Sequence, residues 1–380
     1  MAQRATKRGE DRTPLAGDYD VLICGASFAG LAVARELAGA TREDGSPARV
    51  LMIDRYEIGE RQTSACGIPT GWLEALDLMG AHRQTFGELV VGTPHGTARW
   101  PLPWTLSTFD YHELCRLLAE QSNCDFETAK VNGRTAHTVH TDRGDISAPL
   151  IVDALGWRRM LADGGYQPPD APLSRGLEVH PSGQGDELAI WIDRSIVPEG
   201  YGWSFPAADE LRIGVGSFDP RFHVKDNTVK LAEDLGSEAE RFQGNWIPHR
   251  LRPAVEDDVF FAGDSAGHCL PLTAEGIRTA FYFGIACGRE LRAVVAGDRT
   301  RADALRRYGS FSQSHGWKFH GMLRAQGWVP RLHPRLTHGL VRAMTIRALT
   351  DWSFRHYLRI APPEFAGPAP ARRPRETLAA

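Results

Sequence analysis

The sequence lacks the features that mark several specialised classes of protein. Its six cysteines show neither Cys-x-x-Cys pairs nor metal-ligand spacing with histidine, so neither a zinc site nor a disulfide framework is expected. No stretch reaches about 18 uninterrupted apolar residues, which argues against a membrane-spanning helix. The residues before Asp18 lack the apolar core of a secretory signal, and a net charge of -3 gives no reason to expect nucleic acid as a partner. We therefore expect a cytoplasmic protein without a metal site.

A glycine-rich turn stands between an apolar segment, which ends at Cys24, and an Ala/Leu-rich segment that starts at Leu31. This order predicts a strand, a tight turn and a helix. Gly25 would permit the turn, and Gly30 would let the helix pack closely on the strand. Ser27, Phe28 and Ala29 lie between these glycines, where the helix N-terminus directs free N–H groups at a pyrophosphate. Ser27 replaces the middle glycine, but its small side chain still lets the backbone approach phosphate.

A second apolar segment, residues 48–54, ends in Asp54. A carboxylate at this distance after the glycines is expected to bond the ribose hydroxyls of a dinucleotide. The same carboxylate argues against a 2′-phosphate, since two anions would repel each other. We assign Arg55 and Val131 to the same cofactor site.

A remote segment, residues 257–281, distinguishes between the dinucleotides. A short apolar strand ends at Gly263-Asp264, and a helix is expected to begin near Gly276. This segment resembles the flavin-binding segment of the p-hydroxybenzoate hydroxylase fold. The resemblance implies that Asp264 holds the ribityl chain and that the backbone of Gly276 and Ile277 donates to the pyrimidine end of the flavin. A helix N-terminus there would stabilise the anionic reduced flavin, so the expected cofactor is FAD.

The segment from Tyr201 to Pro206 reads Tyr-Gly-Trp-Ser-Phe-Pro, and Gly214-Val-Gly216 follows seven residues later. Residue types and spacing resemble the YxWxFP…GxG signature of the geranylgeranyl reductase family. The run from Pro271 to Ile277 also resembles a motif of that family, with Ala274 in place of a glycine. Aromatic residues at alternate positions of a strand share one face. Tyr201, Trp203 and Phe205, with Pro206, would form either core or, as the resemblance implies, the substrate-binding wall of an isoprenoid cavity.

Four residues are candidates for catalysis. Tyr201 and Trp203 come from the aromatic motif. Cys66 lies where reductases of the family often carry a Cys-x-x-Gly segment close to the flavin, although Pro69 replaces that glycine; buried free cysteine is also common as inert filling. His268 follows the Gly-Asp strand end and could act as an acid, whereas a lone histidine is more often structural.

The expected architecture is α/β (α+β overall), a Rossmann-type FAD domain with an inserted antiparallel-sheet substrate domain and a C-terminal helical region. The FAD domain is expected to be discontinuous, and both ends of the chain are expected to be tails. The predicted segments are 1–17 (flexible tail), 18–66, 100–165 and 252–297 (FAD domain), 67–99 and 166–251 (substrate domain), 298–362 (helical region) and 363–380 (flexible tail).

Residues 304–350 contain eight Lys or Arg and no Asp or Glu, interleaved with apolar residues. The pattern indicates amphipathic helices with a basic face. Such a region is either a helical cap with solvated arginines or a surface that contacts anionic lipid head groups or a substrate diphosphate at the membrane periphery.

The function that these resemblances imply is saturation of C=C bonds in a hydrophobic isoprenoid or polyprenyl substrate, by hydride transfer from reduced FAD. No separate nucleotide-binding unit for NAD(P)H is visible, so the electron donor is NAD(P)H at the flavin face or ferredoxin. A flavin-dependent monooxygenase or halogenase is one alternative. However, the halogenase motif W-x-W-x-I-P is absent, and Leu155 stands where aromatic hydroxylases carry an acid. A non-redox cyclase of the lycopene cyclase type is another.

Overall fold

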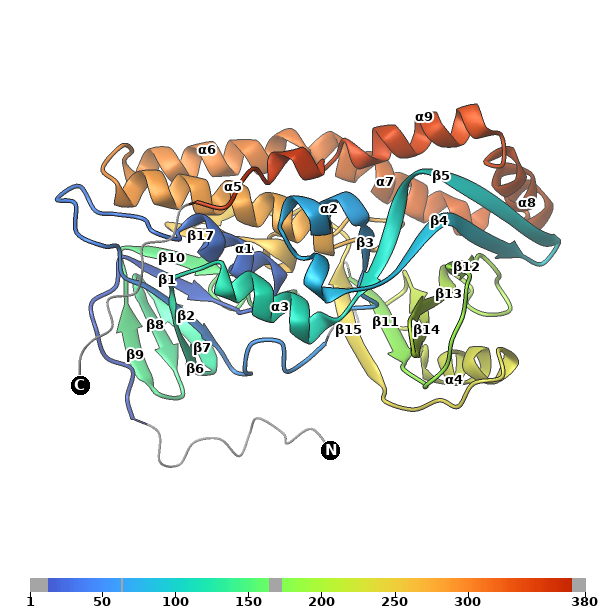
Figure 1. Ribbon diagram of the computed structural model, residues 1–380, viewed down its shortest axis with the longest axis horizontal. Helices are drawn as coiled ribbons and strands as arrows, with labels where there is room; N and C mark the ends of the chain where they lie inside the picture. Colours follow the sequence, from blue (N-terminus) through green and yellow to red (C-terminus); the bar gives the residue numbers. More distant parts are fainter. Residues whose placement is uncertain (1–12, 63, 164–172, 371–380) are drawn as a thin grey trace.

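The computed structural model describes residues 13–62, 64–163 and 173–370, and they form two large sheets beneath a layer of helices (Figure 1). The strands are β1 (Val21–Cys24), β2 (Val50–Asp54), β3 (Gly67–Pro69), β4 (His82–Thr93), β5 (Gly96–Phe109), β6 (Asp125–Thr128), β7 (Val131–Thr135), β8 (Thr138–Thr141), β9 (Gly144–Ser147), β10 (Leu150–Asp153), β11 (Leu173–Val179), β12 (Ala189–Trp191), β13 (Gly200–Ala207), β14 (Glu210–Ser217), β15 (Gln243–Pro248), β16 (Val255–Glu256) and β17 (Val259–Phe261). The α-helices are α1 (Phe28–Glu36), α2 (Thr70–Ala75), α3 (Tyr111–Glu120), α4 (Lys225–Asp234), α5 (Ile277–Val295), α6 (Arg301–Ser314), α7 (Gly316–Trp328), α8 (Pro334–Ala343) and α9 (Arg347–Leu358).

The first sheet has the strand order β16-β17-β10-β1-β2-β6, and every pair from β17 to β6 is parallel. β1 lies at its centre and is buried along its whole length. A continuous apolar run is what a parallel strand needs when both of its faces are covered. The small sheet β7-β8-β9 contributes Val139 and Ile146 to the same core.

Helix α5 lies against α1 because two glycines remove side chains at their contact. A Cβ added at Gly284 would lie 2.7 Å from the carbonyl oxygen of Ala29, and one at Gly288 would lie 2.6 Å from Cβ of Glu36. The close approach fixes the N-terminus of α5 beside the turn that starts α1. The predicted strand, turn and helix at residues 18–38, and the predicted helix after Gly276, are confirmed.

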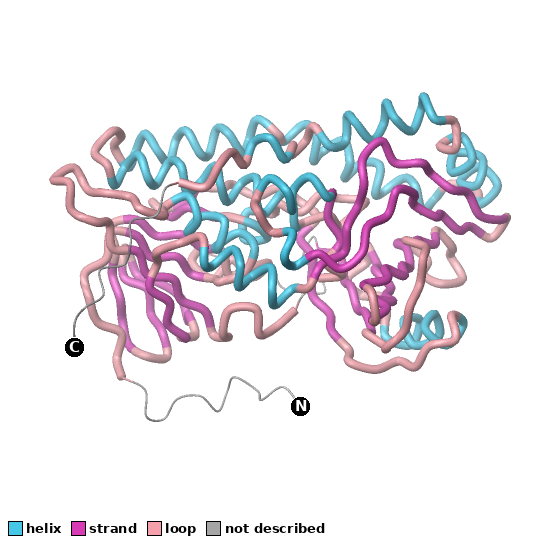
Figure 2. The backbone as a smooth tube through the Cα atoms, viewed as in Figure 1, coloured by secondary structure: helices cyan, strands magenta, loops and turns pink. Residues whose placement is uncertain are grey.

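The second sheet has the order β15-β11-β14-β13-β12-β4-β5-β3 and is antiparallel except where β12 meets β4. Figure 2 shows the long β4–β5 hairpin rising from this sheet toward the helices. Helix α4 covers one face through Leu231, which packs with Val215 of β14. The predicted domain boundary between residues 99 and 100 falls inside β5, which pairs within this sheet.

The C-terminal helices form the upper layer in Figure 1, where α6 lies beside α5 and α8 and α9 cover the hairpin. The indole N–H of Trp100 on β5 donates to the carbonyl oxygen of Val341 on α8 (2.8 Å). Within the described residues, no helix combines the length and the hydropathy that crossing a membrane requires. The predicted fold class is confirmed.

The predicted tails fall partly outside the described residues, which leave out 1–12 and 371–380. Phe365, which the prediction placed in the C-terminal tail, packs on Tyr282 of α5 with ring centroids 4.3 Å apart. The packed part of the chain therefore extends past the predicted boundary at residue 363.

Candidate active site

A cavity of about 1290 Å³ extends from the turn before α1 to the C-terminal helices. It collects the predicted cofactor residues from four separate segments. Those that line it are Ser27, Phe28, Ala29, Asp54, Arg55, Val131, Gly263, Asp264, Gly276 and Ile277. The structure therefore brings together every predicted cofactor residue except Gly25 and Gly30, whose part is to shape the turn.

Gly25 and Gly30 hold the backbone of the turn in a shape that no other residue allows. Gly25 has φ +112°, and a Cβ there would lie 2.2 Å from the carbonyl oxygen of Ala154. A Cβ at Gly30 would lie 1.9 Å from the carbonyl oxygen of Gly25. The first turn of α1 thus closes onto the strand end, and its N-terminus faces the cavity, where anions are stabilised.

Asp54 ends β2 and fixes the same turn. Its carboxylate accepts hydrogen bonds from the backbone N–H of Ala26 (2.8 Å) and of Tyr56 (3.0 Å). Burial raises the pKa of this carboxyl, and the two N–H donors oppose that shift. An ionised carboxylate has about four lone-pair sites, so Asp54 retains the capacity to accept from ligand hydroxyls.

Asp264 faces the cavity from the other side of the turn. Gly263 has φ +63°, and a Cβ there would lie 2.8 Å from Cβ of Ala29, so the strand end can approach α1 only without a side chain. Burial raises the pKa of the Asp264 carboxyl to about 6. No hydrogen bond to this carboxylate is found among the described residues. A partly buried carboxylate with unused acceptors beside a helix N-terminus fits the ribityl hydroxyls that the resemblance implies.

The aromatic motif forms a wall of the same cavity. Tyr201, Trp203 and Phe205 alternate along β13 and line the cavity, whereas Pro206 does not. On the opposite face, a Cβ at Gly202 would meet Leu231 of α4 at 2.8 Å. The strand therefore has one face toward α4 and one toward the cavity. Of the two interpretations of the aromatic stripe, the cavity wall is the one that this geometry fits.

The glycines of the motif provide the space for Trp203. Trp203 pairs with Gly214 across the β13–β14 ladder. A Cβ at Gly214 would lie 2.2 Å from the indole ring, and one at Gly216 would lie 3.4 Å from it. The spacing between YxWxFP and GxG in the sequence thus corresponds to a β-hairpin. In this hairpin the two glycines of GxG leave room for the indole ring of Trp203.

Tyr201 connects this wall to the loop that precedes α5. Its hydroxyl donates to the carbonyl oxygen of Thr273 (2.7 Å), and the hydroxyl of Thr273 contacts that of Tyr357 on α9 (2.9 Å). Glu275 in the same loop is paired with Arg278 at 2.5 Å. The loop is therefore held by β13, α5 and α9 together.

Cys66 and His268 do not line the cavity, although their neighbours Ala65, Gly67 and Cys269 do. The thiol of Cys66 is fully buried and donates to the carbonyl oxygen of Ser64 (3.1 Å), and burial raises its pKa. The ring of His268 stacks on Phe283 at 3.8 Å and contacts the hydroxyl of Ser312 (2.9 Å), and burial lowers its pKa. A catalytic role for either residue stays a prediction.

Sequence reasoning missed much of the distal wall. The cavity continues between apolar residues of the β4–β5 hairpin, β12 and the C-terminal helices, and it also includes Glu178 of β11. The apolar residues in this part include Leu89, Trp100, Trp104, Ile190, Leu332, Leu340, Val341, Met344 and Phe354. Their periodicity resembles that of core residues, so the sequence offers no signal that separates them. Glu178 is one of three polar residues in β11, with Ser174 and Arg175, so its place in that strand alone does not distinguish it.

Comparisons with known proteins bear on the fold and on the predicted family resemblance. No model of a known protein family matches the chain. The chain is 25% identical to digeranylgeranylglycerophospholipid reductase 3 of Methanosphaera stadtmanae over 344 residues, 80% of this chain and 84% of that protein. A solved structure of a geranylgeranyl bacteriochlorophyll reductase-like protein from Thermoplasma acidophilum matches 92% of this chain and 97% of its own, with TM-score 0.76 and 17% identity.

The fold is shared more widely. The solved structure of p-nitrophenol 4-monooxygenase from Pseudomonas putida matches 92% of this chain and 98% of its own, with TM-score 0.68 and 15% identity. Fold and relatives together identify the chain as an enzyme of the oxidoreductase class whose fold these reductases and this monooxygenase share. Within that class, the predicted resemblance to the geranylgeranyl reductase family is confirmed.

Proposed function

We propose that this protein binds FAD and saturates C=C bonds of an isoprenoid or polyprenyl substrate. Reduced FAD would supply the hydride when it is bound. Ser27, Asp54 and Asp264 would hold the nucleotide and ribityl parts, and the start of α5 at Gly276 and Ile277 would face the flavin ring. The residues present fit the cofactor for two reasons. Glycines leave room for it at the turn, and the Asp264 carboxylate has acceptors available for ligand hydroxyls.

One observation carries the proposal: a single cavity joins the nucleotide turn to a long apolar space. An alkene chain offers no polar group by which it can be oriented, so its position must come from the shape of the walls. Tyr201, Trp203 and Phe205 form one wall beside the expected flavin site, and the hairpin and helices α8 and α9 contribute much of the apolar lining farther along. Correct placement of reacting groups can lower a barrier by several kcal/mol, on the order of 7–11 kcal/mol in the best cases.

Three basic residues on the cavity wall suit a polar head group on this substrate. Arg175, Arg194 and Lys225 line the cavity. Arg194 donates to the carbonyl oxygens of Pro330 and Leu332, which places its charge at the C-terminal helices. A diphosphate or phospholipid head group would be attracted there.

A membrane surface is the proposed source of that substrate. Trp317, Trp328 and Trp352 on α7 and α9 are 74%, 68% and 61% exposed. Leu340 on α8 is both exposed and part of the cavity lining, so the apolar surface continues into the cavity. The excess of arginine in residues 304–350 complements anionic lipid head groups.

The test is anaerobic incubation of the dithionite-reduced protein with a panel of polyprenyl diphosphates, unsaturated lipids and quinones, followed by mass spectrometry. A gain of two hydrogens per bond supports the proposal. An unchanged mass with a new retention time would indicate a cyclase or isomerase instead. A product that forms only with dioxygen and gains oxygen would indicate a monooxygenase, and one that gains halide would indicate a halogenase.

The electron donor is proposed to be NAD(P)H or a ferredoxin. Anaerobic mixing of the oxidised protein with NADH, NADPH and reduced ferredoxin in turn, followed by the loss of flavin absorbance, identifies which of them reduces the flavin. A donor that acts directly should bleach the flavin in the absence of any other protein.

A further inference from the structure

A polar crevice of about 390 Å³ adjoins the substrate-side sheet near the cavity described above. Glu210 and Arg212 of β14 and Arg241 line it. Glu178 of β11 lines the large cavity instead. His180 lines neither and is only 5% exposed. These side chains form a continuous polar row between the crevice and the wall of the apolar cavity.

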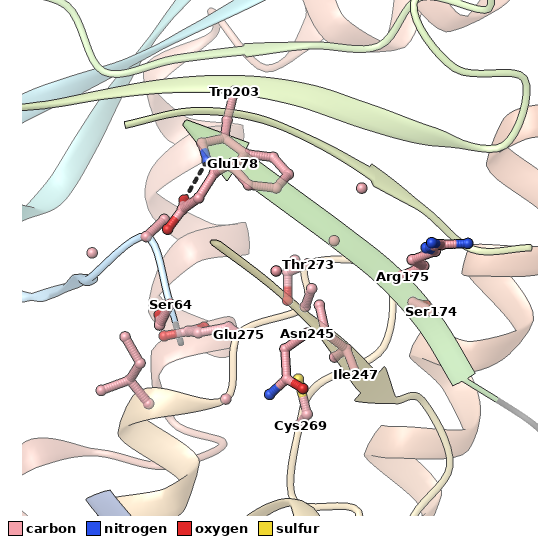
Figure 3. A pocket seen from close by; sticks show the side chains of 18 of the residues that line it. Ser64, Ser174, Arg175, Glu178, Trp203, Asn245, Ile247, Cys269, Thr273 and Glu275 are labelled. Atoms are coloured by element: carbon pink, nitrogen blue, oxygen red, sulfur yellow. Dashed lines mark hydrogen bonds between the residues drawn. The ribbon is translucent and has the colours of Figure 1, made fainter. Parts of the chain in front are cut away.

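Hydrogen bonds join this row without a gap. Nε2 of His180 lies 3.0 Å from Oε1 of Glu178, and Nδ1 lies 3.2 Å from Oε1 of Glu210. At the cavity end, the indole N–H of Trp203 donates to Oε2 of Glu178 (3.2 Å), as Figure 3 shows, and the amide of Gln243 donates to Oε1. The motif tryptophan of the cavity wall therefore holds the carboxylate of Glu178 in place.

Both ring nitrogens of His180 face a carboxylate oxygen, so these two hydrogen bonds need one proton more than a neutral imidazole carries. A carboxylate only accepts hydrogen bonds, and a neutral imidazole donates from one nitrogen. With a carboxyl group on each side of His180, either both ring nitrogens are protonated or one carboxyl holds the proton. The proton can thus reside on His180 or on Glu178 without any side chain moving.

The surrounding charges favour a protonated His180 beside an ionised Glu210. Burial opposes the charge of His180, but hydrogen bonds to Glu178 and Glu210 outweigh it and raise the pKa of the imidazole. Burial also opposes the charge of Glu210, yet the bonds from His180 and Arg212 lower its pKa to about 2. Arg212 lies 3.0 Å and Arg241 3.1 Å from this carboxylate. The nearby thiol of Cys66 stays neutral, since burial raises its pKa.

We propose that Glu178 is the acid that protonates the substrate, and that His180 resupplies its proton from the crevice at Glu210. The proposal rests on the proposed function. Saturation of an alkene breaks one π bond and forms two C–H bonds. One carbon takes the hydride that reduced flavin supplies, and the other takes the carboxyl proton of Glu178. That carboxyl proton is the shared proton, which Nε2 of His180 passes to the Glu178 carboxylate before it reaches the carbon. His180 is then neutral and regains a proton from water at Glu210.

Solvent access explains why such a relay is required. An alkene that occupies the cavity beside Trp203 would displace water from that space, so the proton that Glu178 gives up would have to be replaced by another route. The crevice is lined by charged side chains, and Glu210 is 21% exposed there. His180 is a suitable carrier because its two nitrogens exchange protons on opposite sides of one ring. Glu178 touches the cavity and is the proposed catalytic residue, whereas His180 and Glu210 are positioning and supply residues.

The first experiment needs neither flavin nor turnover. Histidine ¹⁵N signals are followed against pH in the full-length protein, and the His180 signal is identified by its loss in His180→Gln. In the wild type, His180 should remain protonated to a higher pH than a free histidine, and Glu178→Gln and Glu210→Gln should each lower that pH. Glu233→Gln on the exposed side of α4 is the matched control and should change nothing. A His180 signal that Glu178→Gln does not move would overturn the relay.

The second experiment uses the reduced, flavin-loaded protein under anaerobic conditions with the alkene that the wild type reduces. Glu178→Gln should slow bond reduction by about 100-fold or more, the usual contribution of a general acid. Oxidation of the same protein by ferricyanide, which takes electrons without a proton from Glu178, should keep its wild-type rate. Glu178→Asp should recover part of the loss. Wild-type turnover should decline as pH rises through the raised pKa of His180, and His180→Gln should remove that decline.

Failure of the two proposals can be told apart. A Glu178→Gln protein that reduces the alkene within twofold of the wild-type rate overturns the relay alone. A wild-type protein that reduces no C=C bond overturns the proposed function, and the role of Glu178 with it.

Discussion

The two ends of the large cavity are built in different ways. At the end where flavin is proposed to bind, the flavin end, backbone shape decides the geometry. Gly25, Gly30 and Gly263 stand where any Cβ would collide, and Asp54 is held by backbone N–H groups. At the substrate end, side chains decide it: aromatic rings from β13 and apolar residues from the hairpin and C-terminal helices form the wall. The proposed cofactor would therefore be held by backbone, and the proposed alkene chain by side chains.

The comparison predicts that single changes at the flavin end have larger effects. Gly25→Ala should weaken FAD binding by about 100-fold or prevent it. Backbone strain at such a position costs about 1–3 kcal/mol, and the new Cβ would also lie 2.2 Å from a carbonyl oxygen. Each 1.4 kcal/mol corresponds to about a tenfold change in affinity. Flavin absorbance and fluorescence titration of the apoprotein measure the effect.

Gly45→Ala is the matched control for that change. Gly45 also has positive φ (+81°), but nothing lies within 4 Å of a Cβ built there. It should lower thermal stability slightly and leave flavin affinity unchanged. Equal loss of flavin in both variants would show that crowding at the turn does not set the flavin site.

At the substrate end, Trp203→Ala should lower kcat/KM by about 10- to 100-fold, the range expected when a reacting group is misplaced by about 1 Å. Gly214→Ala should act in the same direction with Trp203 still present, because its Cβ would lie 2.2 Å from the indole. Both variants should retain flavin and should broaden the range of chain lengths reduced. Steady-state kinetics on a series of polyprenyl chains would measure this, and unchanged chain-length preference would contradict the tunnel.

Much of the flavin end could be predicted from the sequence, and most of the substrate end could not. Gly25 and Gly263 each belong to a short motif that follows an apolar segment, so the sequence predicts the turn and the strand end, whereas the collisions with Ala154 and Ala29 are seen only in the structure. The relay was missed because Glu210 is far in sequence from Glu178 and His180 and reaches His180 only through the β11–β14 pairing. A signal was present, since Glu178 and His180 share one face of a strand end. Leu340 and Met344 carry no such signal, because apolar residues that line a cavity repeat along a helix with the same period as apolar residues in a core.

A third prediction concerns protons at the flavin end. Burial raises the pKa of the Asp264 carboxyl from 3.8 to about 6, so in the apoprotein this carboxyl should keep its proton up to about pH 6. The unfolded chain therefore loses this proton first, and apoprotein stability should fall as pH rises from about 4 to about 6. Ligand hydroxyl donors favour the ionised form, so FAD binding should release a proton within this window and tighten about tenfold as pH rises through it.

Calorimetry in two buffers of different ionisation enthalpy measures this release. Asp264→Asn should abolish the release and flatten the pH dependence of both stability and affinity. Proton release that persists in Asp264→Asn would assign the effect to another group at the site.

The smallest expected effect lies outside the cavity. Trp328→Ser should weaken binding to vesicles that contain anionic lipid by about threefold, since one interfacial aromatic adds a modest part of membrane affinity. Turnover of a short, water-soluble substrate should stay the same. Sedimentation with vesicles at low and high salt measures the binding. Vesicle affinity that responds neither to salt nor to Trp328→Ser would contradict the proposal that the protein takes its substrate from a membrane surface.

The most direct test of the central claim is an anaerobic titration of the reduced, flavin-loaded protein with an unsaturated polyprenyl lipid, in which flavin absorbance and product mass are followed together. The account predicts one flavin reoxidised for each bond saturated, a mass gain of two hydrogens per bond, and no requirement for dioxygen. Flavin that stays reduced until dioxygen is admitted, with oxygen then found in the product, would contradict it.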